Sequence, residues 1–195
     1  MIPSTKEVYE ELWASNSFRR DKNRLNTHLD LFVGITTNSL ISGLKNDLAP
    51  SVIDWGCGHG AKTVLLEHYG YSVVGCNDIA HNALDDEMKT RFPFFEAQPL
   101  HLASPQKATF SFCVDVLEHL PEEEIIPSLA NIRKHTNNAA FFSIDCAESE
   151  WDGHILHETI RPPEYWFDLM LKHFGTALFL YTLPSRPTIG GLWIS

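Results

Sequence analysis

The sequence is organised around the stretch Val52-Ile53-Asp54-Trp55-Gly56-Cys57-Gly58-His59-Gly60-Ala61. The apolar pair Val52-Ile53 predicts a parallel strand covered on both faces, and Pro50 marks where the preceding structure ends. The glycines predict a turn, because glycine adopts backbone angles that a Cβ forbids and lets a ligand lie against bare backbone. A helix from about Gly60 to Tyr69 would direct its free N–H groups at that turn. The stretch therefore predicts a ligand-binding turn.

Two ligand classes use such a turn. The spacing Gly56-x-Gly58-x-x-Ala61, with Asp78 about twenty residues further on, satisfies the dinucleotide fingerprint and makes NAD a candidate. Against NAD stands Asp54, whose carboxylate would repel a pyrophosphate. The same carboxylate would attract a ligand that carries an ammonium group.

The pattern Asp54-x-Gly56-x-Gly58-x-Gly60 resembles the first motif of the class I S-adenosylmethionine-dependent methyltransferases. Their cofactor carries an amino-acid tail and a sulfonium in place of phosphates. The resemblance implies a Rossmann-like fold of the α/β class, with a doubly wound, mostly parallel sheet, a C-terminal antiparallel hairpin and N-terminal helices. From Ser51 onward the sequence alternates predicted strands and helices, which independently favours a parallel sheet.

Length and composition limit the number of domains, the partners and the cellular compartment that we expect. The 195 residues suit a single domain, 1–195, with a helical cap over 1–50 and the Rossmann-like core over 51–195. The net charge of −10 disfavours nucleic acid as a partner. We find no secretory signal and no apolar run long enough to span a membrane, so we expect a cytoplasmic protein. Four widely spaced cysteines predict buried free thiols.

The first fifty residues predict helices. Thr5 is the expected cap of a helix through Val8, Leu12 and Trp13, and a second helix is expected over 25–44, with Leu29, Phe32 and Leu40 among its apolar positions. In the methyltransferases such a segment often closes over the cofactor. The resemblance therefore makes Trp13, Phe18 and Arg19 candidates for a lid, although a core role for the aromatic residues is also open.

The second strand is predicted over 71–76 and is followed by Asn77, Asp78 and Ile79. The resemblance assigns the ribose hydroxyls to Asp78, whose carboxylate offers paired acceptors. The family pattern has a glycine two residues before this acid, whereas Gly75 lies three before it. Either the strand carries an extra residue or Asn77 contributes. After a third strand over 94–97, the resemblance places Gln98 where the family frequently has an acid that contacts the adenine amino group, although a polar turn residue before Pro99 is equally open.

A fourth strand over 109–114 leads into Asp115-Val116-Leu117-Glu118-His119, which resembles the segment that lines the methionine end of the cofactor in small-molecule methyltransferases. The motifs of nucleic-acid base methyltransferases are missing: the strand ends without D/N-P-P-Y/F, and no cysteine follows a proline. The resemblance thus implies that the cofactor contacts are Asp54, Trp55, Gly56, Cys57, Gly58, Asn77, Asp78, Ile79, Gln98, Pro99, Asp115 and Val116.

A fifth strand over 139–145 precedes an irregular loop, 146–163, where we expect acceptor recognition. His157 or His119 could act as a general base, since imidazole titrates near neutrality, or each could be a structural histidine. His154 and His157 with Asp152 or Asp145 offer metal ligands, but His-x-x-His without a second ligand cluster does not support a metal, and we predict none.

The remaining sequence predicts a helix from Pro162-Pro163 to Gly175, with Trp166, Leu169, Met170 and Phe174 on one face. Two strands over 176–183 and 189–194, joined by 184–188, predict an antiparallel pair.

These motifs indicate an S-adenosylmethionine-dependent methyltransferase that transfers a methyl group to an O or N nucleophile of a small molecule by in-line displacement, with S-adenosylhomocysteine as product. Two alternatives stay open: an NAD-dependent oxidoreductase, and a non-catalytic cofactor- or partner-binding protein on the same fold.

Overall fold

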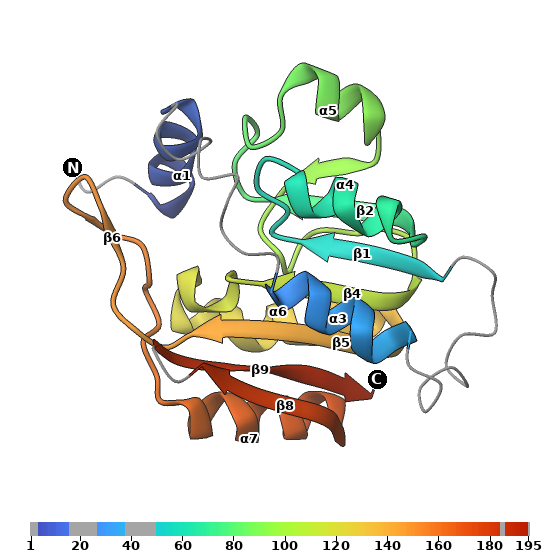
Figure 1. Ribbon diagram of the computed structural model, residues 1–195. Helices are drawn as coiled ribbons and strands as arrows, with labels where there is room; N and C mark the ends of the chain where they lie inside the picture. Colours follow the sequence, from blue (N-terminus) through green and yellow to red (C-terminus); the bar gives the residue numbers. More distant parts are fainter. Residues whose placement is uncertain (1–3, 16–26, 38–49, 184–185, 195) are drawn as a thin grey trace.

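The computed structural model describes residues 4–15, 27–37, 50–183 and 186–194 and contains a seven-stranded sheet (Figure 1). The strand order is β3-β2-β1-β4-β5-β9-β8; β9 runs antiparallel to β5 and β8, and the other neighbouring strands are parallel. This confirms the predicted fold class. The strands are β1 (Ser51–Trp55), β2 (Ser72–Asp78), β3 (Phe95–Ala97), β4 (Ala108–Val114), β5 (Thr136–Asp145), β8 (Ala177–Leu183) and β9 (Arg186–Ile194).

Four strands are longer than the sequence predicts. β2 extends to Asp78, β4 begins at Ala108, β5 begins at Thr136, and β9 begins at Arg186 inside the predicted link. β2 also carries an extra residue, because Val52 pairs with Val73 while Ile53 pairs with Gly75. The bulge therefore lies at Val74, before Gly75, and the register from Gly75 to the end of β2 is regular.

Helices cover both faces of the sheet (Figure 1). On one face lie α3 (Thr27–Thr37) and α4 (Ala61–His68), and on the other lie α6 (Glu122–His135) and α7 (Pro163–Phe174). Shorter elements at the carboxyl ends of the parallel strands include α5 (Asp86–Arg91) and the 3₁₀ turn η2 (Leu117–His119). The predicted irregular loop contains a small hairpin of β6 (Glu150–Trp151) and β7 (His154–Ile155).

Each face of the sheet has its own apolar core. Phe32 of α3 is fully buried, and its ring lies within 6 Å of those of Tyr71, Phe110, Phe112 and Phe141. On the opposite face α7 buries Trp166, Met170 and Phe174, as its periodicity predicts, and leaves Leu169 partly buried. The doubly wound arrangement follows from these two apolar surfaces.

The first helix, α1 (Thr5–Ala14), lies at the carboxyl ends of the parallel strands (Figure 1). It buries Val8, Leu12 and Trp13, as predicted. The expected cap was wrong: Ser4 is the N-cap and forms a reciprocal capping box with Glu7. Thr5 is the first helical residue, and its hydroxyl donates to Glu158 Oε1 at 2.5 Å.

The remaining sequence predictions concern the cysteines, the second helix, the lid candidates and membrane spans. All four cysteines are buried and free, as predicted. α3 occupies the centre of the expected second helix; Leu40 and the lid candidates Phe18 and Arg19 lie outside the described residues. Within the described ranges, the helices are all too short or too polar to cross a bilayer.

Replacing Phe32 with Ala should lower the free energy of unfolding by about 3–5 kcal/mol, because it leaves a cavity between α3 and four aromatic rings. Urea unfolding followed by circular dichroism measures the change. Leu178→Ala is the control: Leu178 is 40% exposed on β8, and its truncation should cost far less. Equal costs for the two variants would contradict the packing of α3 described above.

Candidate functional site

The glycine turn between β1 and α4 has the backbone that the sequence predicts. Gly56, Gly58 and Gly60 have φ angles of 69°, 54° and 82°, in the left-handed region that favours glycine. Side chains are also excluded by space, since a Cβ on Gly56 would lie 2.3 Å from Cγ2 of Val116. The N–H of Cys57 donates to the carbonyl of Asn77 at 2.8 Å, which fixes the turn against the end of β2.

Asp78 closes β2 and holds the turn from the other side. Its two carboxylate oxygens accept the N–H groups of Gly58 and Ala80, each at 3.0 Å. The side chain is buried, and this burial raises the pKa of Asp78 to about 6 despite the stabilising hydrogen bonds. Each carboxylate oxygen keeps further acceptor capacity, which suits hydroxyl donors from a ligand.

Asp54, the second predicted acid, lies beneath the turn. It is 2% exposed, and its Oδ2 accepts the hydroxyl of Thr63 on α4 at 2.6 Å. Burial raises the pKa of Asp54 to about 6 as well. Two buried carboxyl groups with raised pKa values thus flank the glycines, on neighbouring strands β1 and β2.

Several predicted contact residues are structural in this arrangement. The side chain of Trp55 is fully buried and donates from Nε1 to the Ser111 hydroxyl at 2.9 Å, so only its backbone faces the turn region. Cys57 packs in a small core with Cys76. Asn77 is buried and donates from Nδ2 to the carbonyl of Gln98 at 2.6 Å, which ties β2 to the segment after β3.

The remaining predicted contacts lie around the turn. Ile79 and Pro99 are partly buried, and the side chain of Gln98 is exposed. Asp115 has a φ of 56°, and its Oδ2 lies 3.9 Å from Nζ of Lys62 on α4. Val116 packs on Gly56. The structure therefore gathers residues from the ends of β1, β2, β3 and β4 at one edge of the sheet, where ligands of open parallel sheets bind.

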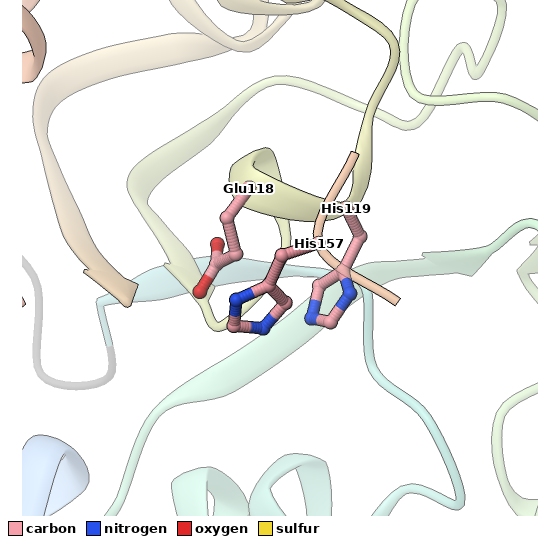
Figure 2. A group of neighbouring side chains, drawn as sticks. All are labelled: Glu118, His119 and His157. Carbon is pink, nitrogen blue, oxygen red and sulfur yellow. The ribbon is translucent and has the colours of Figure 1, made fainter. Parts of the chain in front are cut away.

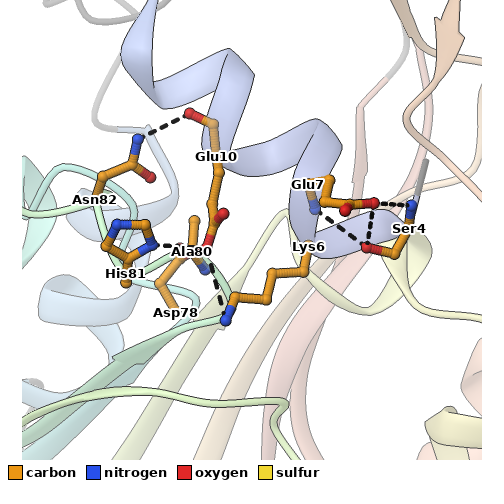
Figure 3. A network of polar contacts seen from close by, with 8 residues as sticks. All are labelled: Ser4, Lys6, Glu7, Glu10, Asp78, Ala80, His81 and Asn82. Atoms are coloured by element: carbon orange, nitrogen blue, oxygen red, sulfur yellow. Dashed lines mark hydrogen bonds and ion pairs between the residues drawn. The ribbon is translucent and has the colours of Figure 1, made fainter.

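Helix α1 covers this edge. A Cβ on Gly58 would lie 2.8 Å from the Trp13 indole, and the rings of Trp13 and His59 are 5.8 Å apart. Polar contacts hold the helix to the segment after β2 (Figure 3): Glu10 Oε1 lies 2.7 Å from His81 Nδ1, and Asn82 donates to the Glu10 carbonyl at 2.8 Å. Trp13, a lid candidate, thus lies directly on the turn.

His119 and His157, the predicted acid–base residues, lie side by side. Their ring centroids are 4.6 Å apart and the rings are nearly perpendicular (Figure 2). Burial, and secondly His157, lowers the pKa of His119 to about 4, so His119 is neutral at neutral pH. Tyr9 of α1 reaches His119 Nδ1 with its hydroxyl at 2.5 Å.

The sequence analysis did not single out Tyr9 or Glu118, although Glu118 directly precedes His119 in a quoted motif. Glu118 lies beside both histidines (Figure 2). The other proposed ligands do not join this group: Asp152 occupies an exposed turn, and His154 pairs with Trp151 in the β6–β7 hairpin.

No protein-family model matches this sequence, and no curated protein sequence matches it significantly. The fold, in contrast, has many similar structures. Magnesium protoporphyrin IX methyltransferase (ChlM) from Synechocystis PCC 6803 with bound S-adenosylhomocysteine superimposes with a TM-score of 0.68 at 16% identity, over 98% of this chain and 99% of that chain.

Two further structures agree. The 1,6-didemethyltoxoflavin-N1-methyltransferase of Burkholderia thailandensis matches with a TM-score of 0.68 at 16% identity, over 100% of this chain and 92% of the other. The N-methyltransferase NodS of Bradyrhizobium japonicum WM9 matches with a TM-score of 0.62 at 13% identity, over 99% of each chain. The chain therefore has the Rossmann-like fold of these S-adenosylmethionine-dependent methyltransferases.

Replacing Gly58 with Ala should displace α1, because the new Cβ would meet the Trp13 indole at 2.8 Å. We expect faster amide hydrogen exchange over residues 4–15, measured by mass spectrometry. Gly153→Ala is the matched control: Gly153 has a similarly positive φ of 78° but nothing within 4 Å of its Cβ position. If Gly58→Ala leaves exchange in α1 unchanged, the packing of Trp13 on the turn is contradicted.

Proposed function

We propose that this protein is an S-adenosylmethionine-dependent methyltransferase that acts on a small-molecule O or N nucleophile. The observation that carries the proposal is the pair of buried carboxyl groups, Asp54 and Asp78, on either side of a three-glycine turn. They lie at the carboxyl ends of β1 and β2, in a fold shared with methyltransferases that bind this cofactor.

The residues fit the cofactor in charge and in hydrogen bonding. Asp78 retains acceptor positions for the two hydroxyls of a ribose, and an ionised Asp54 would attract the ammonium of an amino-acid tail. Gly56 and Gly58 adopt the left-handed backbone of the turn without the strain that a Cβ would bring. The cofactor, when bound, supplies an electrophilic methyl group, and the protein supplies alignment and exclusion of water.

The small-molecule part of the proposal rests on three features. The net charge of −10 opposes a polyanionic substrate. The neighbours named above include enzymes of protoporphyrin and toxoflavin methylation. His119 and His157 lie at the carboxyl end of β4, where an acceptor would meet the methyl donor. Imidazoles there can take up a proton, the role predicted from the sequence, or ligate a metal ion.

S-adenosylhomocysteine should raise the melting temperature of the protein, whereas NAD should not, because the carboxylate of Asp54 opposes a pyrophosphate. Differential scanning fluorimetry with both compounds at equal concentration separates the two cofactor classes. Transfer of label from methyl-labelled S-adenosylmethionine to a component of a fractionated cell extract then tests for catalysis. Stabilisation by NAD alone would refute the proposal, and binding without any transfer would indicate a non-catalytic protein.

Asp78→Asn should weaken S-adenosylhomocysteine binding by about 10- to 100-fold, the equivalent of losing a hydrogen bond to a charged acceptor. Titration calorimetry measures the affinity, and circular dichroism verifies that the variant is folded. Asp86→Asn, an exposed acid in the first turn of α5, is the control and should bind like the wild type. Equal affinities for the two variants would remove Asp78 from the site.

The affinity should also depend on pH in a defined direction. A cationic tail favours ionised carboxylates, whereas Asp54 and Asp78 take up protons as the pH falls through about 6. We therefore expect affinity at pH 5 to be lower than at pH 7.5 by about tenfold for each group that must ionise. Without ligand the sign reverses: raised pKa values in the folded state mean that these two groups lose stabilising proton binding as the pH rises from about 4 to 6. Affinity that is constant across this range would contradict a role for both acids.

A further inference from the structure

Glu118 has an unsatisfied carboxylate oxygen in the interior of the protein. The residue is 0% exposed, and its Oε1 accepts the N–H of Asp145 at 2.7 Å. Its Oε2 is buried and has no hydrogen-bond partner among the described residues. Leaving a buried polar atom unpaired is unfavourable, and more so for a charged group. This oxygen is therefore placed to bind a cation.

Two imidazoles lie next to that carboxylate. Glu118, His119 and His157 each offer one ligand atom, and these atoms lie within 4.8 Å of one another. Across the described ranges no other set of three or more His, Cys, Asp or Glu side chains is grouped so that it could hold a metal ion. In Figure 2 one nitrogen of each ring points to the same side of the cluster.

Backbone carbonyls contact Nδ1 of both histidines. His157 Nδ1 lies 2.5 Å from the carbonyl oxygen of Ala147, and His119 Nδ1 lies 2.9 Å from that of Leu156. A carbonyl only accepts, so Nδ1 of His157 carries the proton and its Nε2 carries the lone pair. Nδ1 of His119 also contacts the Tyr9 hydroxyl, which can donate or accept. Metal-ligating histidines are typically held in this way, with the other ring nitrogen donating to a carbonyl or carboxylate.

The backbone around the cluster is also fixed. The Thr159 N–H donates to the Glu118 carbonyl at 3.0 Å, and the Thr159 hydroxyl donates to the Leu120 carbonyl at 2.7 Å. These bonds join the segment that carries His157 to η2, which carries Glu118 and His119. The three side chains thus come from two segments that are far apart in sequence and are joined by hydrogen bonds.

We propose that Glu118, His119 and His157 bind a divalent transition-metal ion of the Zn²⁺ or Co²⁺ type. Two neutral imidazoles and one carboxylate are a donor set that these ions prefer and that Mg²⁺ and Ca²⁺ do not. Ligand atoms of a tetrahedral zinc site are about 3.3 Å apart, so binding would draw the three atoms together by about 1–1.5 Å. At least one position of the ion is left for water or a substrate oxygen.

The place of this site indicates the class of acceptor, a point that rests on the proposed function. Glu118 and His119 follow Val116 with only Leu117 between them, and Val116 packs on Gly56 of the glycine turn. An ion there would lower the pKa of a hydroxyl bound to it, as it does for water. A hydroxyl-bearing small molecule would then release its proton to solvent water and react as an alkoxide or phenoxide. Its oxygen would form the new C–O bond while the bond between the methyl carbon and the sulfonium sulfur breaks.

Metal binding is tested on the full chain without any methyl donor. The protein is stripped with a chelator, and Co²⁺ is added while the visible absorption bands of the ion are recorded. Calorimetry with Zn²⁺ then gives stoichiometry and affinity. We expect one ion per chain, tetrahedral-type Co²⁺ absorption, and displacement of Co²⁺ by Zn²⁺. A preference for Mg²⁺, or no binding above the level of an unrelated protein with a similar histidine content, would overturn the inference.

Single variants identify the ligands. His157→Ala and the isosteric Glu118→Gln should each lower Zn²⁺ affinity by at least about 100-fold, since even outer-shell changes cost about 10- to 100-fold. His154→Ala, three residues from His157, is the control and should leave the affinity unchanged. Wild-type affinity in both ligand variants would refute the site. S-adenosylhomocysteine binding is measured separately on the wild-type protein, so a wild type that binds the cofactor but no metal ion refutes this inference alone.

Discussion

The carboxylate of Asp78 is the constraint on which the rest of the site depends. It accepts the N–H groups of Gly58 and Ala80 at the end of β2, while its own carbonyl accepts the N–H of Gln98 after β3. One buried residue at the end of β2 thereby joins the glycine turn after β1 to the segment after β3. Because the interior disfavours an unpaired carboxylate, the turn can take few other conformations without losing these bonds.

This constraint places two chemically different regions along one edge of the sheet. Near β1 and β2 the edge is acidic, because the buried carboxyl groups of Asp54 and Asp78 lie on either side of the glycine turn. Near β4 and β5 it holds two imidazoles and Glu118, linked to β5 through the Asp145 N–H. β1 and β4 are neighbours in the sheet order, at the point where the direction of winding reverses. A ligand spanning this point would contact both regions.

Much of the fold could be predicted from local sequence, because buried strands have apolar runs and the glycine turn has its own spacing. The predicted ends of helices and strands were wrong where the local sequence is compatible with more than one boundary. Ser4 and Thr5 can both cap a helix, and the partner Glu7 decides in favour of Ser4. The start of β5 was missed because Asn137 and Asn138 interrupt its apolar pattern, although both continue the strand.

The candidate site could be predicted only where one motif holds all the residues. The turn and Asp78 follow from spacing, but the environment of a side chain does not: Trp55 lies in the quoted motif and yet points into the core toward Ser111. The cluster of Glu118, His119 and His157 needed the fold, since its members come from two loops after different strands. No spacing rule connects residues that only the sheet order brings together.

The position of Trp13 has a kinetic consequence. Its indole lies 2.8 Å from the position that a Cβ on Gly58 would take, so a ligand that approached Gly58 from that side would require α1 to shift. For such a ligand the observed association rate would level off at high ligand concentration, because the shift of α1 would then limit the rate. The polar contacts from Glu10 to His81 and Asn82 hold α1 in place, so their strength would set how fast α1 can shift.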